Sequence, residues 1–310
     1  MSYAYLFPGQ GSQSIGMLAE LAGEYPEIKQ TFEQGSEILK QDLWAIVSDG
    51  PAEELNRTEN TQPIMLCASV AVWRAWSKQF TEPPDLMAGH SFGEYTALVC
   101  AGMLDFEAAV PLARFRGEVM QQAVPEGQGA MAAVLGLEDD VLAKACAEAA
   151  QGQVVEAVNF NAPGQVVIAG DADAVARAID AAKDAGAKRA VTLPLSVPSH
   201  SSLMQPAAEK LRDYLSEIIL QASDVSIIHN ADVKIHANAD DIKNALYEQL
   251  FSPVRWVETI QSMVAKGTQT LVELGPGKVL TGLSKRIDRS VPCYCVQDLK
   301  SFEQALEKVS

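Results

Sequence analysis

The alternation of hydrophobic and polar positions predicts an N-terminal half built from short buried strands and longer helices. Two short apolar runs, residues 3–7 and 85–89, end at glycine-containing loops and are typical of buried strands. In segment 62–80, apolar residues recur at helical spacing, which predicts a long buried helix. Further helices are expected over 16–25, 26–40, 53–58, from about 93 onward, and over 106–120.

The pattern changes near residue 128. Strands are predicted over 129–136, 154–160, 165–169 and 189–195, and helices over 139–150 and 173–186. The two middle strands are joined by Asn161-Ala162-Pro163-Gly164, which is a strong turn signal. The order β-α-β-β-α-β is that of a ferredoxin-like unit. We therefore expect a ferredoxin-like subdomain over residues 128–196, inserted into an α/β core that is made of residues 1–127 and 197–310.

The chain after this insertion returns to the pattern of the N-terminal half. Residues 194–200 contain two prolines and predict a rigid, irregular stretch. A helix is expected over 203–220, strands over 226–229, 269–273 and 293–296, and a tight turn over 274–278. Short apolar strands that are separated by helices indicate a parallel sheet.

Composition and charge exclude several classes of function. The 310 residues are 48% hydrophobic and 21% charged, which is ordinary for a globular protein. Twenty-four Lys and Arg against forty Asp and Glu give a net charge of −16, which argues against a nucleic-acid binder and against adhesion to an anionic membrane. Five cysteines without a CxxC pair indicate neither a disulfide framework nor a metal site. With no signal peptide or membrane span in the pattern, we expect a cytoplasmic location.

The strongest chemical signal is segment 89–93, which reads Gly-His-Ser-Phe-Gly. It fits the G-x-S-x-G nucleophile elbow, and it has the required strand before it and helix after it. Such a turn lifts the hydroxyl of Ser91 clear of the sheet, and the start of the helix supplies backbone N–H groups for an oxyanion. The alternative is an ordinary Gly-Ser loop.

A serine nucleophile needs a base, and the chain has four histidines. His90 adjoins Ser91, so on a sharp turn the two side chains should diverge. His229 ends a predicted strand and fits a structural role, while His236 lies in a polar segment. His200 lies in the proline-restricted loop that enters a helix, and restricted loops on a rigid scaffold are common catalytic positions. His200 is therefore the leading candidate, with a structural role as the alternative.

No acid completes a triad in the order Ser…Asp/Glu…His. Asp171 and Asp173 precede His200 but fall in the predicted insertion. A Ser-His dyad that is oriented by a backbone carbonyl is therefore the better expectation. Two glycine-containing segments, 8–13 and 275–278, match neither the dinucleotide nor the phosphate-loop fingerprint. The first fits a close approach of the Gln10 N–H to a reacting oxygen, and the second a structural turn.

Several segments, in one order, resemble the bacterial malonyl-CoA:acyl carrier protein transacylase family, and the resemblance covers essentially the whole chain. The matching segments are 7–13, 89–95, 116–117, 129–134, 159–161, 165–170, 197–201 and 273–277. The resemblance implies an α/β-hydrolase-like core with a ferredoxin-like insertion. It also implies an acyltransferase of fatty acid biosynthesis that moves malonyl from CoA to the phosphopantetheine thiol of the carrier protein.

The resemblance also implies roles for the reacting groups. Ser91 would take the malonyl group as an ester, and His200 would act as general base and then as general acid. The backbone carbonyl of Gln249 would orient His200 in place of an acidic side chain. The backbone N–H groups of Gln10 and Phe92 would form the oxyanion hole.

Two further residues acquire substrate-binding roles from the resemblance. Arg116 would bind the free carboxylate of the malonyl group, since a guanidinium offers two parallel donors to a carboxylate. Without the resemblance, an exposed arginine on a helix surface is the favoured interpretation of Arg116. Asn161 would line the path of the pantetheine arm.

The expected substrates are malonyl-CoA and a phosphopantetheinylated acyl carrier protein, and no bound cofactor is expected. A serine esterase or thioesterase on the same core is the main alternative. A non-catalytic carrier-binding module and a domain of a modular synthase are the others, although we expect a free-standing monomer. The net charge of −16 should repel an acidic carrier protein, unless the carrier docks on a small positive patch. Two basic clusters are candidates for it: Lys183, Lys188 and Arg189, and Lys278, Lys285, Arg286 and Arg289.

Overall fold

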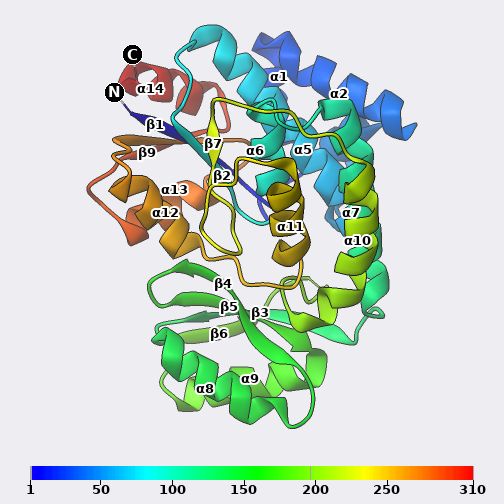
Figure 1. Cartoon of the computed structure of the whole chain (residues 1–310), viewed down its shortest axis with the longest axis vertical. Coiled ribbons are helices and arrows are strands. Elements are labelled where there is room, and N and C mark those ends of the chain that lie inside the picture. Colours follow the sequence, from blue (N-terminus) through cyan, green and yellow to red (C-terminus); the bar gives the residue numbers. More distant parts are fainter. Residues whose placement is uncertain (1, 196, 310) are drawn as a thin grey trace.

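The computed structural model describes residues 2–195 and 197–309 and contains two sheets, each within its own unit (Figure 1). The larger unit holds a five-stranded sheet, and the smaller unit, drawn below it in Figure 1, holds a four-stranded sheet. The smaller sheet falls within the expected range 128–196, whose bounds as a domain stay a prediction. Ser196, the last residue of that range, lies outside the described residues.

The five-stranded sheet is parallel throughout, as the buried apolar runs predict. Its order is β7-β2-β1-β8-β9, with β7 at Ser226–Ile227, β2 at Leu86–Gly89, β1 at Tyr3–Phe7, β8 at Thr270–Leu274 and β9 at Cys293–Val296. Phe7, the last residue of β1, pairs with Gly89, the last residue of β2. The carboxyl ends of these two strands therefore lie side by side, where parallel sheets commonly carry their sites.

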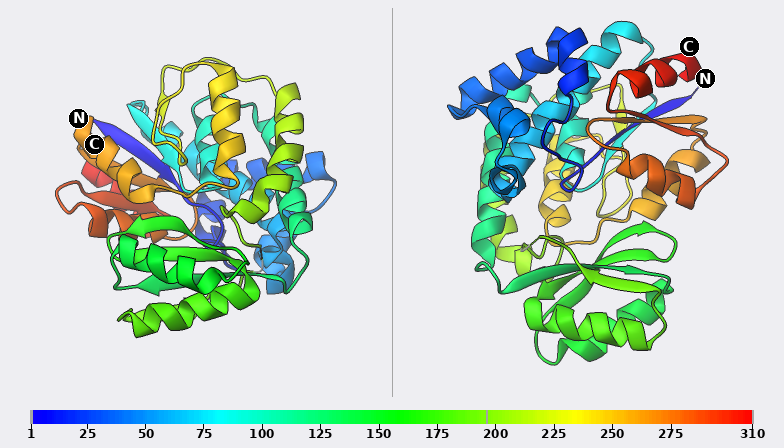
Figure 2. Two further views of the ribbon diagram at one scale, coloured as in Figure 1. Left: turned by 60° about the horizontal axis from the view of Figure 1, so that its bottom comes forward. Right: turned by 180° about the vertical axis from the view of Figure 1, so that it is seen from behind.

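Helices cover both faces of this sheet (Figure 2). Tyr3, Tyr5 and Phe7 of β1 pack into one apolar cluster with residues of α2, α5 and α14, whereas Ala4 and Leu6 pack with residues of α12 and α13 on the other face. The helices of this unit are α1 Ala19–Glu24, α2 Pro26–Leu39, α3 Leu43–Asp49, α4 Ala52–Asn56, α5 Thr58–Gln79, α6 Gly93–Cys100, α7 Phe106–Ala123, η1 Ser202–Met204, α10 Gln205–Glu217, α11 Ala239–Gln249, α12 Trp256–Ala265, α13 Val279–Ile287 and α14 Leu299–Val309.

The smaller unit has the predicted β-α-β-β-α-β order. It consists of β3 Gly129–Leu135, α8 Asp139–Ala150, β4 Val155–Ala162, β5 Gln165–Asp171, α9 Ala172–Asp184 and β6 Arg189–Thr192. The sheet order β4-β5-β3-β6, with antiparallel neighbours throughout, is that of a ferredoxin-like fold. Both helices pack on the face of the sheet that points away from the larger unit (Figures 1 and 2).

Short polar contacts join the two units. The Phe160 N–H donates to the Val254 carbonyl at 3.0 Å, and the Val254 N–H donates to the Val158 carbonyl at 2.8 Å. From α13, the guanidinium of Arg286 donates to Gln165 Oε1 at 2.5 Å and to the Pro163 carbonyl at 3.3 Å. The connection between β4 and the segment before α12 is therefore strand-like, with backbone hydrogen bonds in both directions.

Some local expectations differ from the structure. Asn161 and Ala162 belong to β4, and the turn contains Pro163 and Gly164, because register shifts lengthen the strand and Gly164 supplies the positive φ of +65°. No helix is predicted for α3 or for α11 to α14, although side-chain caps at Asp42 and Asn238 mark the starts of α3 and α11. Among the described residues, no helix combines the length and apolar character that a bilayer crossing requires.

Candidate active site

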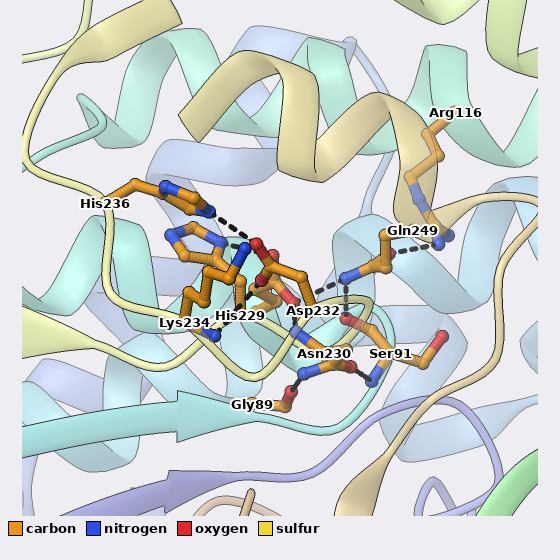
Figure 3. Close-up of polar contacts among 10 residues, drawn as sticks. Gly89, Ser91, Arg116, His229, Asn230, Asp232, Lys234, His236 and Gln249 are labelled. Carbon is orange, nitrogen blue, oxygen red and sulfur yellow. Dashed lines mark hydrogen bonds and ion pairs between the residues drawn. The ribbon is translucent and has the colours of Figure 1, made fainter. Parts of the chain in front are cut away.

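Ser91 lies in a tight turn between β2 and α6 (Figure 3). Its φ of +51° falls in the left-handed region, which residues other than glycine rarely adopt. A Cβ on Gly89 would lie 1.8 Å from the carbonyl carbon of Gly93, and a Cβ on Gly93 would lie 2.1 Å from the carbonyl oxygen of Phe7. Both glycines are therefore required for the turn, and the segment has the strand–turn–helix context that the sequence predicts.

The side chain of Asn230 holds this turn in place through two hydrogen bonds. The sequence did not identify Asn230 as a site residue. The Ser91 N–H donates to Asn230 Oδ1 at 2.7 Å, and Asn230 Nδ2 donates to the Gly89 carbonyl at 2.8 Å (Figure 3). Asn230 comes three residues after β7, the neighbour of β2 in the sheet. Its position beyond the carboxyl end of that strand is the signal that the sequence offers. Strained backbone persists only where its surroundings hold it, and Asn230 provides two such contacts.

His200 faces Ser91 from the loop before η1. His200 Nε2 lies 2.7 Å from Ser91 Oγ, and His200 Nδ1 lies 2.7 Å from the backbone carbonyl oxygen of Gln249. Gln249 is the last residue of α11, so its carbonyl has no partner further along the helix and is free to accept. His200 also has a positive φ, +67°, and its N–H donates to the Leu250 carbonyl at 3.1 Å.

The surroundings of His200 keep the imidazole neutral. Burial lowers the pKa of His200 to about 3, and the positive charge of Arg116 acts in the same direction. Because the Gln249 carbonyl can only accept, the ring proton resides on Nδ1 and the lone pair of Nε2 faces the Ser91 hydroxyl. This is the arrangement that a general base requires before proton transfer.

Arg116 shares the cavity of Ser91 and His200, whose lining also includes Gln10, Phe92, Met131 and Asn159. Only 1% of Arg116 is exposed, so the expectation of a surface arginine is wrong. The burial has a local cause in the next residue. A Cβ on Gly117 would lie 2.6 Å from the Cα of Glu59, so the glycine lets α7 lie directly against the start of α5.

The guanidinium of Arg116 contacts neutral acceptors. Nη2 donates to Gln249 Oε1 at 3.1 Å and Nη1 to the sulfur of Met120 at 3.2 Å, while Nε has no partner among the described residues. The aromatic rings of Phe92 and Tyr95 lie 5.8 and 5.3 Å from the guanidinium carbon. Burial lowers the pKa of Arg116. A buried cation with neutral partners is a site at which a carboxylate would gain strong hydrogen bonds.

A second buried charged group, Glu94 on α6, lies behind the elbow and was also missed. Glu94 is fully buried and accepts hydrogen bonds from His229 Nδ1 at 2.8 Å, from the Asn230 N–H at 2.9 Å and from Gln249 Nε2 at 2.9 Å. His229 therefore has the structural surroundings that its strand-end position suggested. Next to it, His236 contacts Asp232 at 2.9 Å (Figure 3).

The remaining predicted residues occupy distinct positions. Gln10 and Phe92 both line the cavity, and their backbone N–H groups make no hydrogen bond within the described residues, so both are available as donors. His90 Nε2 donates to Asn161 Oδ1 at 2.7 Å, and His90 in turn lines the cavity. Asn161 itself is not among the lining residues, whereas its neighbour Asn159 is. The imidazole of His90 thus points away from Ser91 toward β4.

Within residues 2–195 and 197–309, no group of three or more His, Cys, Asp and Glu side chains is arranged to hold a metal ion. The five cysteines are free thiols. The cavity brings together the Ser91 hydroxyl, a neutral imidazole, two backbone donors and a buried guanidinium.

Known proteins with the same sequence pattern and fold are acyl transferases. The acyl transferase domain family matches residues 4–303. The malonyl CoA-acyl carrier protein transacylase of Escherichia coli K12 is 54% identical over 98% of this chain and 99% of its own length. The crystal structure of an acyl carrier protein S-malonyltransferase from Vibrio cholerae is 55% identical with a TM-score of 0.95, covering 98% of this chain and 100% of that one. A structure of a type II PKS acyl-carrier protein in complex with its malonyl-transacylase matches with a TM-score of 0.98 and 52% identity, covering 99% of this chain and 100% of the matched chain. The chain belongs to the acyl transferase domain family.

Proposed function

We propose that this protein is a malonyl-CoA:acyl carrier protein transacylase of fatty acid biosynthesis. The observation that carries the proposal is the placement of Arg116. This buried cation, with neutral partners, lines the same cavity as the Ser91–His200 pair. A transferase for acetyl groups has no use for such a cation, because an uncharged acyl group would leave it buried and unpaired. The names of the relatives support the same activity.

The first half-reaction loads the serine. Ser91 Oγ attacks the thioester carbonyl carbon of malonyl-CoA while His200 Nε2 takes the hydroxyl proton. The Gln249 carbonyl stabilises the imidazolium that forms, and the N–H groups of Gln10 and Phe92 donate to the developing oxyanion. The carbon–sulfur bond then breaks, His200 gives its proton to the leaving thiolate, and CoA departs.

The second half-reaction unloads the serine onto the carrier protein. His200 removes the proton of the phosphopantetheine thiol, and the sulfur attacks the carbonyl carbon of the malonyl ester. The bond to Ser91 Oγ breaks and the hydroxyl regains a proton from His200. Throughout both halves, Arg116 holds the free carboxylate of the malonyl group. Asn161 supports the wall of the pantetheine path through its contact with His90.

A small basic surface would dock the carrier protein. All seven candidate residues are exposed. Lys183 also lies 3.2 Å from Asp180, and Arg286 donates to the β4–β5 turn. Weak docking of this kind is sensitive to salt and lets the carrier leave after each transfer. Replacing Lys285 or Arg189 by Glu should raise the KM for the carrier without changing the KM for malonyl-CoA. An unchanged carrier KM in both variants would place the docking surface elsewhere.

We also propose that the protein acts as a cytoplasmic monomer, with malonyl-CoA and the carrier as its substrates and no bound cofactor. Its free thiols suit a reducing compartment.

The experiment that tests the function is an acyl-transfer assay with malonyl-, methylmalonyl- and acetyl-CoA, with and without the phosphopantetheinylated carrier protein. We expect transfer of malonyl to the carrier, little transfer of acetyl, and slow release of free malonate when the carrier is absent. Rapid hydrolysis that ignores the carrier would identify a thioesterase instead.

A further inference from the structure

The buried side chain of Gln249 connects three parts of the site through its two ends. Its Nε2 donates to the Ser91 carbonyl at 3.0 Å and to Glu94 Oε2 at 2.9 Å, while its Oε1 accepts from Arg116 Nη2 at 3.1 Å (Figure 3). The backbone carbonyl of the same residue accepts from His200. One residue at the end of α11 therefore contacts the nucleophile, the base and the guanidinium.

The chemistry of the neighbours fixes the orientation of this amide. A guanidinium can only donate and a backbone carbonyl can only accept, so the oxygen of Gln249 must face Arg116 and the nitrogen must face Ser91. The second proton of Nε2 then points at Glu94, which completes the row Glu94–Gln249–Arg116. An acidic group at one end polarises the amide so that its oxygen accepts more strongly from the cation at the other end.

The row also explains how a buried guanidinium is held without a carboxylate against it. A direct ion pair would compensate the charge of Arg116, but it would occupy the donors that a substrate carboxylate needs. Here the Gln249 amide lies between the Glu94 carboxylate and the Arg116 guanidinium. Nε of Arg116 is without a partner among the described residues. Burial lowers the pKa of Arg116, and Tyr95 and, to a smaller extent, the charge of Glu94 act in the opposite direction.

We propose that Glu94 is a positioning residue for carboxylate selection: it sets the Gln249 amide, which in turn holds the guanidinium of Arg116 for the free carboxylate of the acyl group. This inference rests on the proposed function. Glu94 has a second connection, because the Asn230 N–H donates to it and Asn230 accepts from the Ser91 N–H. Loss of Glu94 therefore affects the nucleophile as well, and the two effects must be separated.

The separating measurement is the ratio of kcat/KM for serine acylation by malonyl-CoA and by acetyl-CoA. Acetyl-CoA has no free carboxylate, so it reports the nucleophile alone, and the ratio isolates the contribution of Arg116. We expect Glu94→Gln, which keeps the shape and removes the charge, to lower this ratio by about tenfold, mainly through a higher KM for malonyl-CoA. In an Arg116→Ala background, Glu94→Gln should leave the ratio unchanged, because its effect passes through Arg116.

The matched control is Glu273→Gln. Glu273 is equally buried in β8, but it accepts from the Leu280 and Thr281 N–H groups at the start of α13 and has no contact with Arg116 or Gln249. We expect this variant to lose thermal stability while its malonyl/acetyl ratio stays within about twofold of the original.

Equal losses with both CoA esters in Glu94→Gln would overturn the proposal, because they would show support of the elbow alone. If Glu94→Gln does not fold, Gln249→Met decides the question, since it removes the side-chain amide and keeps the backbone carbonyl that His200 uses. An unchanged ratio in that variant would also overturn the proposal. A wild-type protein without preference for malonyl would instead refute the proposed function, and the inference would fall with it.

Discussion

The two units of the molecule have different interiors. At the site of the larger unit, Glu94, Arg116 and His200 are buried, and both Ser91 and His200 adopt left-handed backbone conformations. In the smaller unit, the helices pack on the sheet through aliphatic side chains such as Val134, Ile168, Val175 and Ile179. Among its described residues, the buried polar side chain is Asn159, which lines the cavity.

The larger unit supplies the reacting groups, whereas the smaller unit helps to enclose the cavity. The residues that the predicted insertion contributes to the cavity are Met131, Asn159 and Leu195, and all three are neutral. Every charged or strained group that the proposed reaction uses comes from the larger unit. Changes in the larger unit should therefore alter what reacts and how fast, whereas changes inside the smaller unit should alter stability and leave selectivity intact. The following predictions test that division.

The largest effect is expected from removal of the nucleophile. Ser91→Ala should reduce malonyl transfer to the carrier by about 10⁵-fold, because Ser91 supplies the cavity hydroxyl that contacts the base His200. Thermal unfolding should stay close to that of the original protein, since only a hydroxyl is lost. Transfer above about 1% of the original rate would contradict the assignment of Ser91.

Removal of the guanidinium should come second. Arg116→Ala should lower the malonyl/acetyl ratio of kcat/KM by about 100-fold while acetyl transfer persists, because the site loses the donors that recognise the carboxylate. The measurement is acylation of the enzyme by each CoA ester under the same conditions. A ratio that does not change would remove the argument on which the proposed function depends.

The protonation of His200 gives a smaller, pH-dependent effect. Because burial and the charge of Arg116 lower its pKa to about 3, kcat/KM should show no decline near pH 6.5, the ordinary value for histidine. In Arg116→Ala the charge is gone, so the pKa of His200 should rise and the acid limb should move to higher pH. Profiles with acetyl-CoA for both proteins test this shift, and coincident profiles would contradict it.

The low pKa of His200 also makes the stability of the folded state depend on pH. The unfolded chain takes up a proton at His200 near pH 6.5, whereas the folded chain does so only near pH 3. The unfolded state therefore binds more protons between these values, and the contribution of His200 to folding stability is lost as the pH falls through that window. This change would appear in urea unfolding curves at different pH values.

The smallest effect on selectivity is expected from the smaller unit. Ile168→Ala, in the centre of β5, should lower the free energy of unfolding by about 2–5 kcal/mol, because it leaves a cavity between the sheet and its helices. The malonyl/acetyl ratio should stay within about twofold. A ratio that falls as far as in Arg116→Ala would show that the smaller unit also determines selectivity.

Local patterns in the sequence predict much of the fold and part of the site. The parallel strands, the ferredoxin-like order and the elbow around Ser91 follow from short segments, because apolar runs and glycine spacing act over a few residues. The contact between His200 and the Gln249 carbonyl spans 49 residues, and its role came only from the family resemblance. The burial of Arg116 depends on the packing of α7 against α5, which the sequence pattern of α7 alone does not specify.

The residues that sequence reasoning missed share one property. Glu94 contacts Asn230 and the side chain of Gln249 across sequence separations of 136 and 155 residues. Their roles arise where α6, the segment after β7 and the end of α11 come together, and no local periodicity in the sequence predicts that these segments are neighbours. Asn161 was misplaced for a different reason, since the Asn-Ala-Pro-Gly signal fixes that a turn exists but not where the lengthened strand ends.

The central claim is that Ser91 carries the malonyl group between CoA and the carrier protein. Mass spectrometry of the enzyme after brief mixing with malonyl-CoA, followed by peptide mapping, tests it most directly. We expect one malonyl group on the peptide that contains Ser91, no labelling of Ser91→Ala, and loss of the label when the phosphopantetheinylated carrier is added. A label on any other residue, or one that the carrier does not remove, would contradict it.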